Sequence, residues 1–373
     1  MRIALDGNPL LTQTQRGIGK TTRRLIEEFA RRSNPFDIFC YVPGSAWQRP
    51  PHWRHVFLRR LAPGESLPSA AARDGASLVH LMDYFFPLYD PAEVAAATQR
   101  PFRLVVTVRD IIPLHFPREK KAGLGRLRRN LFPILGAVDL IIAISQATRE
   151  DLIRHLDVPG EKIEVVHHGV DLEVFHDRFT AEEVEDVRRR YKLPARYIVY
   201  VSAFDPRKNH HLLLNAYHTF LRMTGTDCAL VLVGPGRLPA TLVSHIRKLN
   251  LQERVIVLHG LPVRDLALVY RGATLSAFPS LYEGFGNPLL EGMACGTPTV
   301  ALAKASVPEV AGDGALLVEE NDHTAFAGAM ARVLQDPDLS RDLGERGRRR
   351  AERFTWTAAA QKTLAIYERL VSS

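Results

Sequence analysis

The stretch Glu283-Gly-Phe-Gly-Asn-Pro-Leu-Leu-Glu291 holds a carboxylate at each end, with a glycine loop and the expected start of a helix between them. The apolar run 274–278 comes before it, and a turn at 296–298 comes after it. Strand, loop, helix and turn in this order form the repeating unit of an α/β protein. Gly284 and Gly286 allow the backbone to come close to a ligand, because glycine has no Cβ.

The same stretch has the chemistry of a nucleotide-sugar site. Pro288 fits the first turn of a helix, where its missing N–H costs nothing. The free N–H groups at that helix start favour an anion such as a phosphate. Glu291 follows Asn287 by about one helical turn, so its carboxylate can face the same ligand and accept hydrogen bonds from sugar hydroxyls. We therefore predict that this stretch binds a sugar linked to a diphosphate.

The composition is that of a globular protein. The 373 residues are 46% hydrophobic and 24% charged, which gives room for two domains of ordinary size. No run approaches the roughly 20 apolar residues that span a bilayer, and the first residues show no signal-peptide pattern. Cys40, Cys228 and Cys295 stand far apart among apolar residues, so we expect buried reduced thiols. These features predict a cytoplasmic protein, either free or peripheral on the inner face of the cytoplasmic membrane.

Short apolar runs alternate with helical patterns along the chain, as is typical of parallel strands that helices cover on both faces. We predict an α/β fold with two Rossmann-like, doubly wound parallel-sheet domains that face a cleft. The expected strands are 2–6, 78–82, 104–108, 140–144, 163–167, 197–203, 229–233, 255–258, 274–278, 299–302 and 315–318. The expected helices include 20–31, 146–156, 210–222 and 240–249. The expected domains are 1–176 on the acceptor side, 177–355 for the nucleotide sugar, and a final helix within 356–373 that returns to the first domain.

A second motif follows the first strand of the second domain, in the segment Ser202-Ala-Phe-Asp-Pro-Arg-Lys-Asn209. Arg207 and Lys208 would lie at the same sheet end as the Glu283 loop, where two cations can neutralise a diphosphate. The alternative is a pair of solvated turn charges. Gly234 follows the next strand and would let a base or ribose approach, although Gly-Pro-Gly is first of all a turn.

The first domain offers two further candidates. Gly17 and Gly19 precede a helix and form either a glycine loop that touches the ligand or a plain helix start. An NTPase P-loop is disfavoured, because Thr14 stands where that motif needs glycine. Arg109 and Asp110 end a strand and either face the cleft on the acceptor or sugar side, or pair with each other internally.

We find no pattern of metal ligands and expect no metal requirement. His167 and His168 lack a third ligand at metal spacing, so we interpret them as structural or cleft-lining. The pair Asp336 and Asp338 lies between helices, where a turn is expected. Ser145 is expected to cap the helix 146–156.

A basic segment stands out within the net charge of +8. Residues 118–135 combine six Lys and Arg residues with leucines at helical spacing. Such a helix can lie on an anionic membrane, and the alternative is a solvated face whose leucines pack in the core. We expect the excess positive charge to attract phosphorylated substrates, not nucleic acid.

Together these motifs resemble those of the retaining glycosyltransferases with the GT-B fold, of the large glycosyltransferase family 4. Glu283 and Glu291 match the family's Glu-x7-Glu hallmark, and Arg207 and Lys208 are similar to its Arg/Lys pair. Three further segments resemble family motifs: 17–19, 166–171 and 306–309. The resemblance covers essentially the whole chain.

The resemblance implies transfer of a hexose, with retention, from a nucleotide-diphosphate sugar to a saccharide or lipid-linked saccharide. Arg207 and Lys208 would stabilise the departing diphosphate, Glu283 would hold the sugar, and Glu291 would bind the ribose. Arg207, Lys208 and Glu283 are the expected catalytic residues. The residues expected to bind the donor are Gly17, Gly19, Ser202, Gly234, Gly284, Phe285, Gly286, Asn287, Leu289 and Glu291.

GDP-mannose is the favoured donor, because the segments 204–209 and 111–114 resemble bacterial polysaccharide mannosyltransferases; UDP- and dTDP-sugars stay open. The acceptor would belong to envelope polysaccharide or lipopolysaccharide synthesis. Many relatives carry His where this chain has Arg109, a change that would alter the sugar or acceptor contact or weaken activity. A sugar-nucleotide epimerase or hydrolase, and a non-catalytic nucleotide-sugar-binding protein, are the alternative functions.

Overall fold

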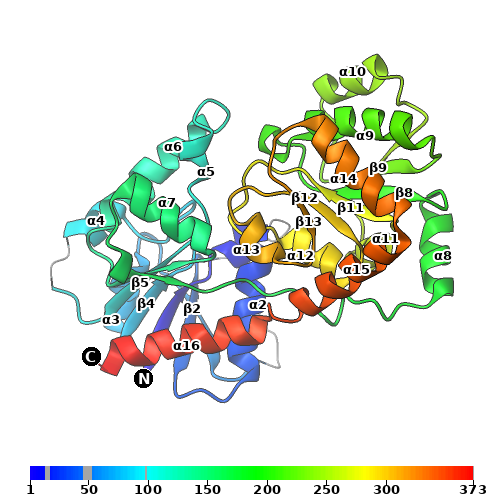
Figure 1. Cartoon of the computed structure of the whole chain (residues 1–373). Helices are drawn as coiled ribbons and strands as arrows, with labels where there is room; N and C mark the ends of the chain where they lie inside the picture. The colour runs from blue at the N-terminus through cyan, green and yellow to red at the C-terminus, as the bar shows by residue number, and fades with distance from the viewer. Residues whose placement is uncertain (13–16, 45–52, 97–98, 373) are drawn as a thin grey trace. The chain divides into compact units, whose positions relative to one another are not determined.

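The structure is a computed structural model that describes residues 1–12, 17–44, 53–96 and 99–372. The chain forms two units (Figure 1), the first made of Met1–Gly169 and Trp356–Ser373 and the second of Val170–Thr355. The boundary precedes the expected one after residue 176. The reason is that the backbone N–H of Val170 donates to the carbonyl of Phe354, which joins this segment to the second unit.

The first unit is built on a parallel sheet whose described strands have the order β3-β2-β1-β4-β5-β6-β7. Side chains alternate along each strand, so Ile3 and Leu5 of β1 enter the core on one face and Ala4 on the other. Both faces are therefore buried, as the apolar runs predict. The strands are β1 Arg2–Asp6, β2 Asp37–Val42, β3 Val56–Arg60, β4 Leu78–Leu81, β5 Arg103–Val108, β6 Leu140–Ala143 and β7 Ile163–Val165.

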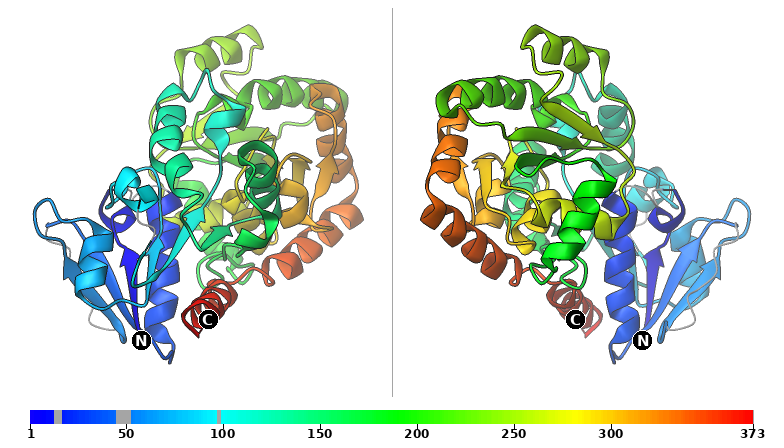
Figure 2. Two further views of the ribbon diagram at one scale, coloured as in Figure 1. Left: turned by 90° about the vertical axis from the view of Figure 1, so that its left-hand side faces the viewer. Right: turned by 90° about the vertical axis from the view of Figure 1, so that its right-hand side faces the viewer.

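Helices cover both faces of this sheet (Figure 2). On one face lie α2 (Gly17–Arg31) and α16 (Trp356–Ser372). The other helical elements of the unit are α1 Pro9–Thr12, α3 Leu67–Arg73, α4 Pro91–Ala96, α5 Ile112–His115, α6 Lys121–Arg126, η1 Leu127–Leu131, η2 Phe132–Ile134, α7 Gln146–Leu156 and η3 Gly160–Lys162. Of these, α3, α4, α7 and the segment α6–η1–η2 contribute to the core on the opposite face.

The last helix of the chain, α16, packs on the first sheet beside α2. The hydroxyl of Tyr367 lies 2.6 Å from Nδ1 of His80 in β4. The hydroxyl of Thr357 donates to Glu28 of α2 over 3.0 Å. This end of the chain is therefore part of the first unit.

The second unit is built on a parallel sheet whose strands have the order β10-β9-β8-β11-β12-β13. On one face α9 packs against α14, and on the other α12 packs against α11 and α15. The strands are β8 Tyr197–Val201, β9 Ala229–Val233, β10 Val255–Leu258, β11 Leu275–Phe278, β12 Thr299–Leu302 and β13 Leu316–Val318. The helical elements are α8 Ala181–Arg190, η4 Pro206–Lys208, α9 His210–Thr224, α10 Ala240–Lys248, α11 Val263–Arg271, α12 Asn287–Ala294, α13 Val307–Ala311, α14 His323–Gln335 and α15 Pro337–Ala351.

The expected strands and helices agree with these elements to within a few residues. Sequence analysis did not predict β2, β3 or α8. Thr180 and Glu183 form a reciprocal capping box at the start of α8 and stabilise this charged segment as a helix. The predicted cap at Ser145 is confirmed, since its hydroxyl accepts from the N–H of Thr148.

Within the basic segment 118–135, residues 121–134 are helical, and their winding changes from α6 through the π-helix η1 to the 3-10 helix η2. Leu127 and Leu131 are buried, and Leu124 and Leu135 pack against the same core. The leucine face therefore belongs to the protein core, as the alternative interpretation predicted, whereas Arg118, Lys121, Arg128 and Arg129 are exposed.

All three cysteines are buried and free of disulfide bonds. None of the described helices combines the length and the apolar content that are needed to cross a bilayer.

Candidate active site

Each sheet has one point where the strand order reverses, between β1 and β4 in the first unit and between β8 and β11 in the second. Ligands of open parallel sheets bind outside the carboxyl ends of the strands at such a switch point. The loop after β8 carries Arg207 and Lys208, and the loop after β11 carries Glu283. The two predicted motifs of the second unit therefore flank its switch point.

The loop after β8 holds its two cations in a fixed local conformation. The carboxylate of Asp205 accepts from the N–H of Arg207 and caps the single turn η4. Asn209 then adopts the left-handed conformation (φ 58°), which asparagine tolerates better than most residues, and turns the chain into α9. The carbonyl of Lys208 accepts a 2.7 Å hydrogen bond from Tyr200 of β8.

The loop after β11 is tied to the loop after β8 by backbone and side-chain hydrogen bonds. The N–H of Leu281 donates to the carbonyl of Arg207 over 2.9 Å. The hydroxyl of Ser280 lies 3.0 Å from that of Tyr200. Ser306, just before α13, places its hydroxyl 2.9 Å from the carbonyls of both Glu283 and Phe285. The two loops therefore form one connected structure.

Glu283 binds both cations at once. Its Oε1 accepts from Nζ of Lys208, and its Oε2 accepts from Nη1 of Arg207 at 3.1 Å. The same Nη1 donates to the carbonyl of Tyr282 at 2.8 Å. Lys208 and Glu283 are each 6% exposed, so these charges interact with little screening by solvent. Asp205 adds a second carboxylate, with Oδ1 3.8 Å from Nε of Arg207, so the two cations face two carboxylates in the free protein.

The electrostatics of this group favour an ionised carboxylate. Burial opposes the charge of Glu283, but Lys208 and then Arg207 outweigh burial, and the pKa of Glu283 is lowered. Burial lowers the pKa of Lys208 from its ordinary value, and the attraction of Glu283 opposes that shift. Burial, followed by the charge of Lys208, lowers the pKa of His210 to about 4. His210 is therefore neutral at pH 7, and its Nε2 lies 3.1 Å from the hydroxyl of Ser202.

Two glycines at this edge of the sheet stand where a residue with a Cβ would be strained or would clash. Gly286, the residue before α12, has φ +100°, a conformation that side chains with a Cβ rarely adopt. A Cβ on Gly234 would lie 2.3 Å from the carbonyl of Ser202, which is a clash. The loops after β8 and β9 therefore come into close contact only because residue 234 is glycine.

The remaining predicted donor residues lie on the loop after β11 and on α12. Leu289 is fully buried, so its side chain serves packing, and the expectation that it contacts the donor finds no support. The ring of Phe285 packs edge-on against that of Phe354, with the ring centres 5.6 Å apart. Asn287 begins α12, and Glu291 follows on the same helix, partly buried. A buried oxygen of Asn287, Oδ1, has no hydrogen-bond partner within the described ranges.

Arg109 has internal partners in the first unit. Its guanidinium donates to the hydroxyls of Thr21 and Thr22 at the start of α2, over 2.6 and 2.7 Å. Nη1 also lies 3.3 Å from Nε2 of His168. Burial lowers the pKa of Arg109 to about 10, while the nearby carboxylates oppose that shift, so the side chain is charged at neutral pH. The adjoining cavity has a volume of about 30 Å³, which is the size of a water molecule.

Two other expectations for the first unit are corrected. Asp110 caps a turn by accepting from the N–H of Ile112 at 3.0 Å, so the internal Arg109–Asp110 pair is not the arrangement found. Gly17 and Gly19 lie in the first turn of α2, and the helix starts at Gly17, not at residue 20 as expected. A Cβ on Gly17 would meet no atom of the described residues within 4 Å. Thr14 lies outside the described residues.

Sequence analysis missed three residues that hold the site together. Tyr200 lies within a buried strand, where the sequence gives no signal of its role. Ser280 directly follows the expected strand and Ser306 begins a segment that resembles a family motif, so both had a positional signal. These hydroxyls position the loops and do not carry charge.

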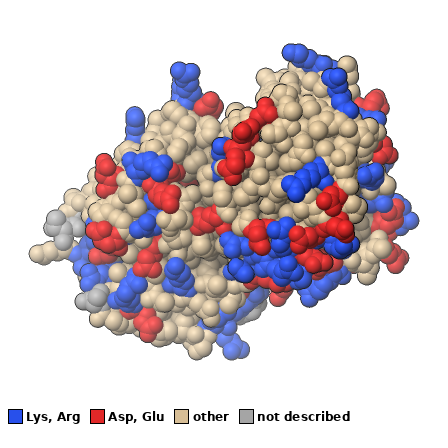
Figure 3. All heavy atoms as spheres, in the orientation of Figure 1, with Lys and Arg blue, Asp and Glu red and all other residues tan. Residues whose placement is uncertain are grey.

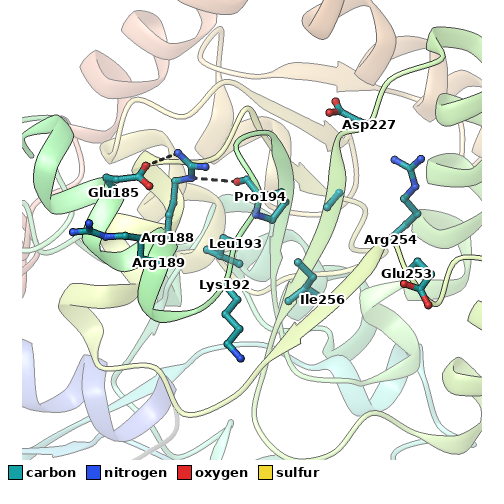
Figure 4. A pocket seen from close by; sticks show the side chains of 11 residues that line it. Glu185, Arg188, Arg189, Lys192, Leu193, Pro194, Asp227, Glu253, Arg254 and Ile256 are labelled. Atoms are coloured by element: carbon teal, nitrogen blue, oxygen red, sulfur yellow. Dashed lines mark hydrogen bonds and ion pairs between the residues drawn. The ribbon is translucent and has the colours of Figure 1, made fainter.

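A pocket of about 500 Å³ lies at the opposite edge of the second sheet (Figure 4). Its lining includes residues next to the amino ends of β8, β9 and β10, among them Pro194, Asp227 and Arg254. Basic and acidic side chains alternate around it, and Arg188 is already paired with Glu185. Because parallel sheets bind ligands at the carboxyl ends of their strands, we do not assign this pocket to the nucleotide.

The similarity to solved structures extends over the residues of both units. Sucrose-phosphate synthase from Thermosynechococcus elongatus matches with a TM-score of 0.79 and 25% identity over 100% of this chain and 99% of that one. Anabaena HepE in complex with UDP-glucose matches with a TM-score of 0.76 over 100% of both chains, but at 18% identity it shows the fold alone. Two parallel-sheet units with these structural neighbours define a glycosyltransferase of the GT-B fold.

Sequence comparison gives the family. Residues 183–350 match the model of the glycosyl transferases group 1, and residues 15–174 match the model of glycosyltransferase family 4. The O-antigen chain mannosyltransferase B of Escherichia coli is 30% identical over 274 residues, which is 72% of this chain and 71% of that protein. This chain belongs to the group 1 glycosyltransferases of family 4.

The buried ion group predicts the effect of removing its carboxylate. Glu283→Gln leaves Lys208 without its carboxylate partner and Arg207 with only the more distant Asp205. Loss of one partner of a buried pair costs about 3 kcal/mol. We expect a clearly lower urea midpoint for this variant. Asp338→Asn removes an exposed partner of Arg341 and should leave the midpoint nearly unchanged. Equal midpoints for Glu283→Gln and the wild type would contradict the importance of this group.

Proposed function

We propose that this glycosyltransferase moves mannose from GDP-mannose, with retention at the anomeric carbon, to a saccharide or lipid-linked saccharide of envelope polysaccharide synthesis. The observation that carries the proposal is the group formed by Arg207, Lys208 and Glu283 at the switch point of the second sheet. The E. coli relative, an O-antigen chain mannosyltransferase, supports the choice of sugar and of acceptor class.

The cations have the charge that a departing nucleoside diphosphate needs. In the free protein the two positive charges are paired with Glu283 and with Asp205, whose Oδ1 lies 3.8 Å from Nε of Arg207. A diphosphate that enters this edge would compete with these carboxylates for the two cations in a largely buried environment, where each interaction is stronger than in water. As the bond from the anomeric carbon to the leaving oxygen breaks, negative charge grows on the phosphate, and Arg207 and Lys208 stabilise it without reorganisation.

Retention follows from attack on the same face that the diphosphate leaves. The acceptor oxygen forms the new bond to the anomeric carbon while the bond to the phosphate oxygen breaks, and that phosphate oxygen takes the acceptor proton. Glu283 is not the nucleophile of this reaction, because both its oxygens bind cations. In this proposal Glu283 holds the cations in place and contacts the sugar, and no covalent sugar–enzyme bond forms.

The start of α12 has acceptors for the hydroxyls of the donor. Oδ1 of Asn287 is buried, without a partner among the described residues, and an additional hydrogen-bond donor at this position would satisfy it. Glu291 follows about one turn later on the same helix and is proposed to bind the ribose. The two cations supply the positive charge at the diphosphate, so we propose that transfer needs no metal ion.

The basic segment is proposed to bring the first unit to an anionic membrane. Arg118, Lys121, Arg128 and Arg129 are exposed and form no ion pair with any carboxylate in the part of the chain that the structure describes. Blue side chains stand out over α6 in Figure 3, whereas blue and red side chains mix along α15. Phe86, 37% exposed, stacks under Arg126 and adds an aromatic group to this basic face.

Loss of one cation tests the chemical part of the proposal. Lys208→Ala should lower kcat by roughly 30- to 1,000-fold, since a preorganised charge of this kind contributes about 2–4 kcal/mol in the transition state. Lys248→Ala, on the exposed face of α10, is the control and should keep full turnover. Transfer to acceptor and donor hydrolysis are measured separately by product analysis. Full transfer by Lys208→Ala would overturn the assignment.

A thermal-shift series identifies the base of the donor. GDP and GDP-mannose should raise the unfolding temperature more than UDP or dTDP, because a ligand that binds only the folded state stabilises it. A larger shift of the unfolding temperature with UDP would mean that the donor base is uracil and not guanine. The proposal that the protein is a transferase would still stand. No shift with any nucleoside diphosphate would count against donor binding at this site.

Flotation with liposomes tests the membrane proposal. The protein should float with vesicles that contain anionic lipid at low salt and stay behind with neutral vesicles. Replacing both Arg128 and Arg129 by Glu should abolish flotation. The control replaces Arg247 and Lys248 on α10 by Glu, which makes the same charge change on the second unit. Equal flotation of both double variants would exclude a specific basic face.

A further inference from the structure

Three potential metal ligands from α5 and α7 meet on the first unit. His115 is the last residue of α5, and Asp151 and His155 lie one turn apart on α7. Nε2 of His115 lies 2.8 Å from Oδ2 of Asp151, and Nε2 of His155 lies 3.8 Å from Oδ1. One ligand atom from each residue lies within 4.8 Å of the others.

The geometry matches the size of a small transition-metal ion. Zn²⁺ binds imidazole nitrogen and carboxylate oxygen at about 2.0–2.2 Å, so tetrahedral ligands stand roughly 3.3 Å apart. The two separations from the carboxylate, 2.8 and 3.8 Å, lie on either side of that value. Small side-chain rotations would therefore bring all three ligand atoms to bonding distance.

The burial of the three residues suits a site that solvent can reach. Asp151 is 8% exposed, whereas His115 is partly buried and His155 is exposed. The carboxylate is thus held within the protein, and the more exposed imidazole can close on an ion. The rings of His115 and His155 are nearly perpendicular, at 89°, with their centres 5.1 Å apart. Two rings that are not stacked can direct their nitrogens at one point from different sides.

We propose that His115, Asp151 and His155 bind one divalent transition-metal ion, with Zn²⁺ as the best match. Two imidazoles and one carboxylate suit Zn²⁺, Co²⁺ and Ni²⁺, whereas Mg²⁺ and Ca²⁺ prefer oxygen ligands only. Three protein ligands leave a fourth position for water or an added ligand.

The bound ion would link two segments that follow neighbouring strands. α5 begins just after Asp110 at the end of β5, and α7 begins just after Ser145 at the end of β6. β5 and β6 pair in the sheet. The ion would therefore stabilise the connection between these two segments. It takes no part in the transfer reaction proposed for the second unit, so the two proposals fail independently.

A second histidine pair in the chain provides a matched control. The rings of His211 and His245 lie 4.8 Å apart, and Nε2 of His245 lies 2.8 Å from the amide oxygen of Asn215. This pair has a neutral amide where the first pair has a carboxylate. The His211–His245 pair therefore shows how two neighbouring histidines bind a metal ion when no carboxylate stands beside them.

The experiment uses the full chain without a histidine tag, freed of metal by a chelator. Calorimetric titration with Zn²⁺ should give one site per chain, and Co²⁺ should give visible absorption bands typical of nitrogen and oxygen ligands. His155→Ala, an exposed position, should weaken binding by more than about tenfold. Asp151→Asn keeps the shape of the carboxylate and should weaken binding similarly, and His211→Ala should not weaken it.

The outcomes separate the proposal from its alternatives. Wild-type binding that is lost in His155→Ala and Asp151→Asn, with unchanged circular dichroism, supports the site. No Zn²⁺ binding by the wild type, unchanged binding by both variants, or loss of binding in His211→Ala would each overturn it. Transfer activity in the presence of the chelator tests the metal-free reaction separately and does not affect this result.

Discussion

The pairing of the buried carboxylate of Glu283 with the buried Lys208 and the partly buried Arg207 constrains the second unit more than any other interaction. Glu283 and Lys208 are far apart in the sequence, and their burial is tolerable only if the loops after β8 and β11 stay in contact. Strand order fulfils this condition, because β8 and β11 are neighbours in the sheet. The hydroxyls of Tyr200 and Ser306 then fix the two loops locally.

Most of the fold could be predicted from the sequence because burial on both faces leaves a simple pattern. Strands such as Ala229–Val233 and Thr299–Leu302 are continuous apolar runs, and their bounds match the expectation. α8 was missed because only Val187 of its ten residues is buried, so the pattern of apolar residues is weak and its stability rests on charges and a cap. The edge strand β3 was missed for a similar reason, since it ends in two exposed arginines.

The candidate site was partly predictable. The motifs around Lys208 and Glu283 indicated their sheet edge, but sequence spacing does not show that Glu283 binds both cations. Arg109 illustrates a further limit: its position at the end of β5 suggested a ligand contact. The structure shows that its partners are Thr21 and Thr22, and no pattern in the sequence relates these positions. Contacts between distant polar side chains need coordinates, because neither periodicity nor propensity encodes them.

The two switch points differ in charge, and this difference supports binding of the diphosphate by the second unit. At the switch point of the first sheet, β1 ends in Asp6 and β4 is followed by Asp83. Burial, partly offset by the N–H of Asn8, raises the pKa of Asp6 well above its ordinary value, and Asp83 adds to that shift. A phosphate at this edge would meet carboxyl groups, whereas sugar hydroxyls can donate to them. At the corresponding edge of the second sheet Arg207 and Lys208 supply two cations, which are paired with Glu283 and Asp205 in the free protein. The same topology therefore places carboxyl groups, which suit hydroxyls, at the edge of the first sheet and two cations, which an anion can bind, at the edge of the second.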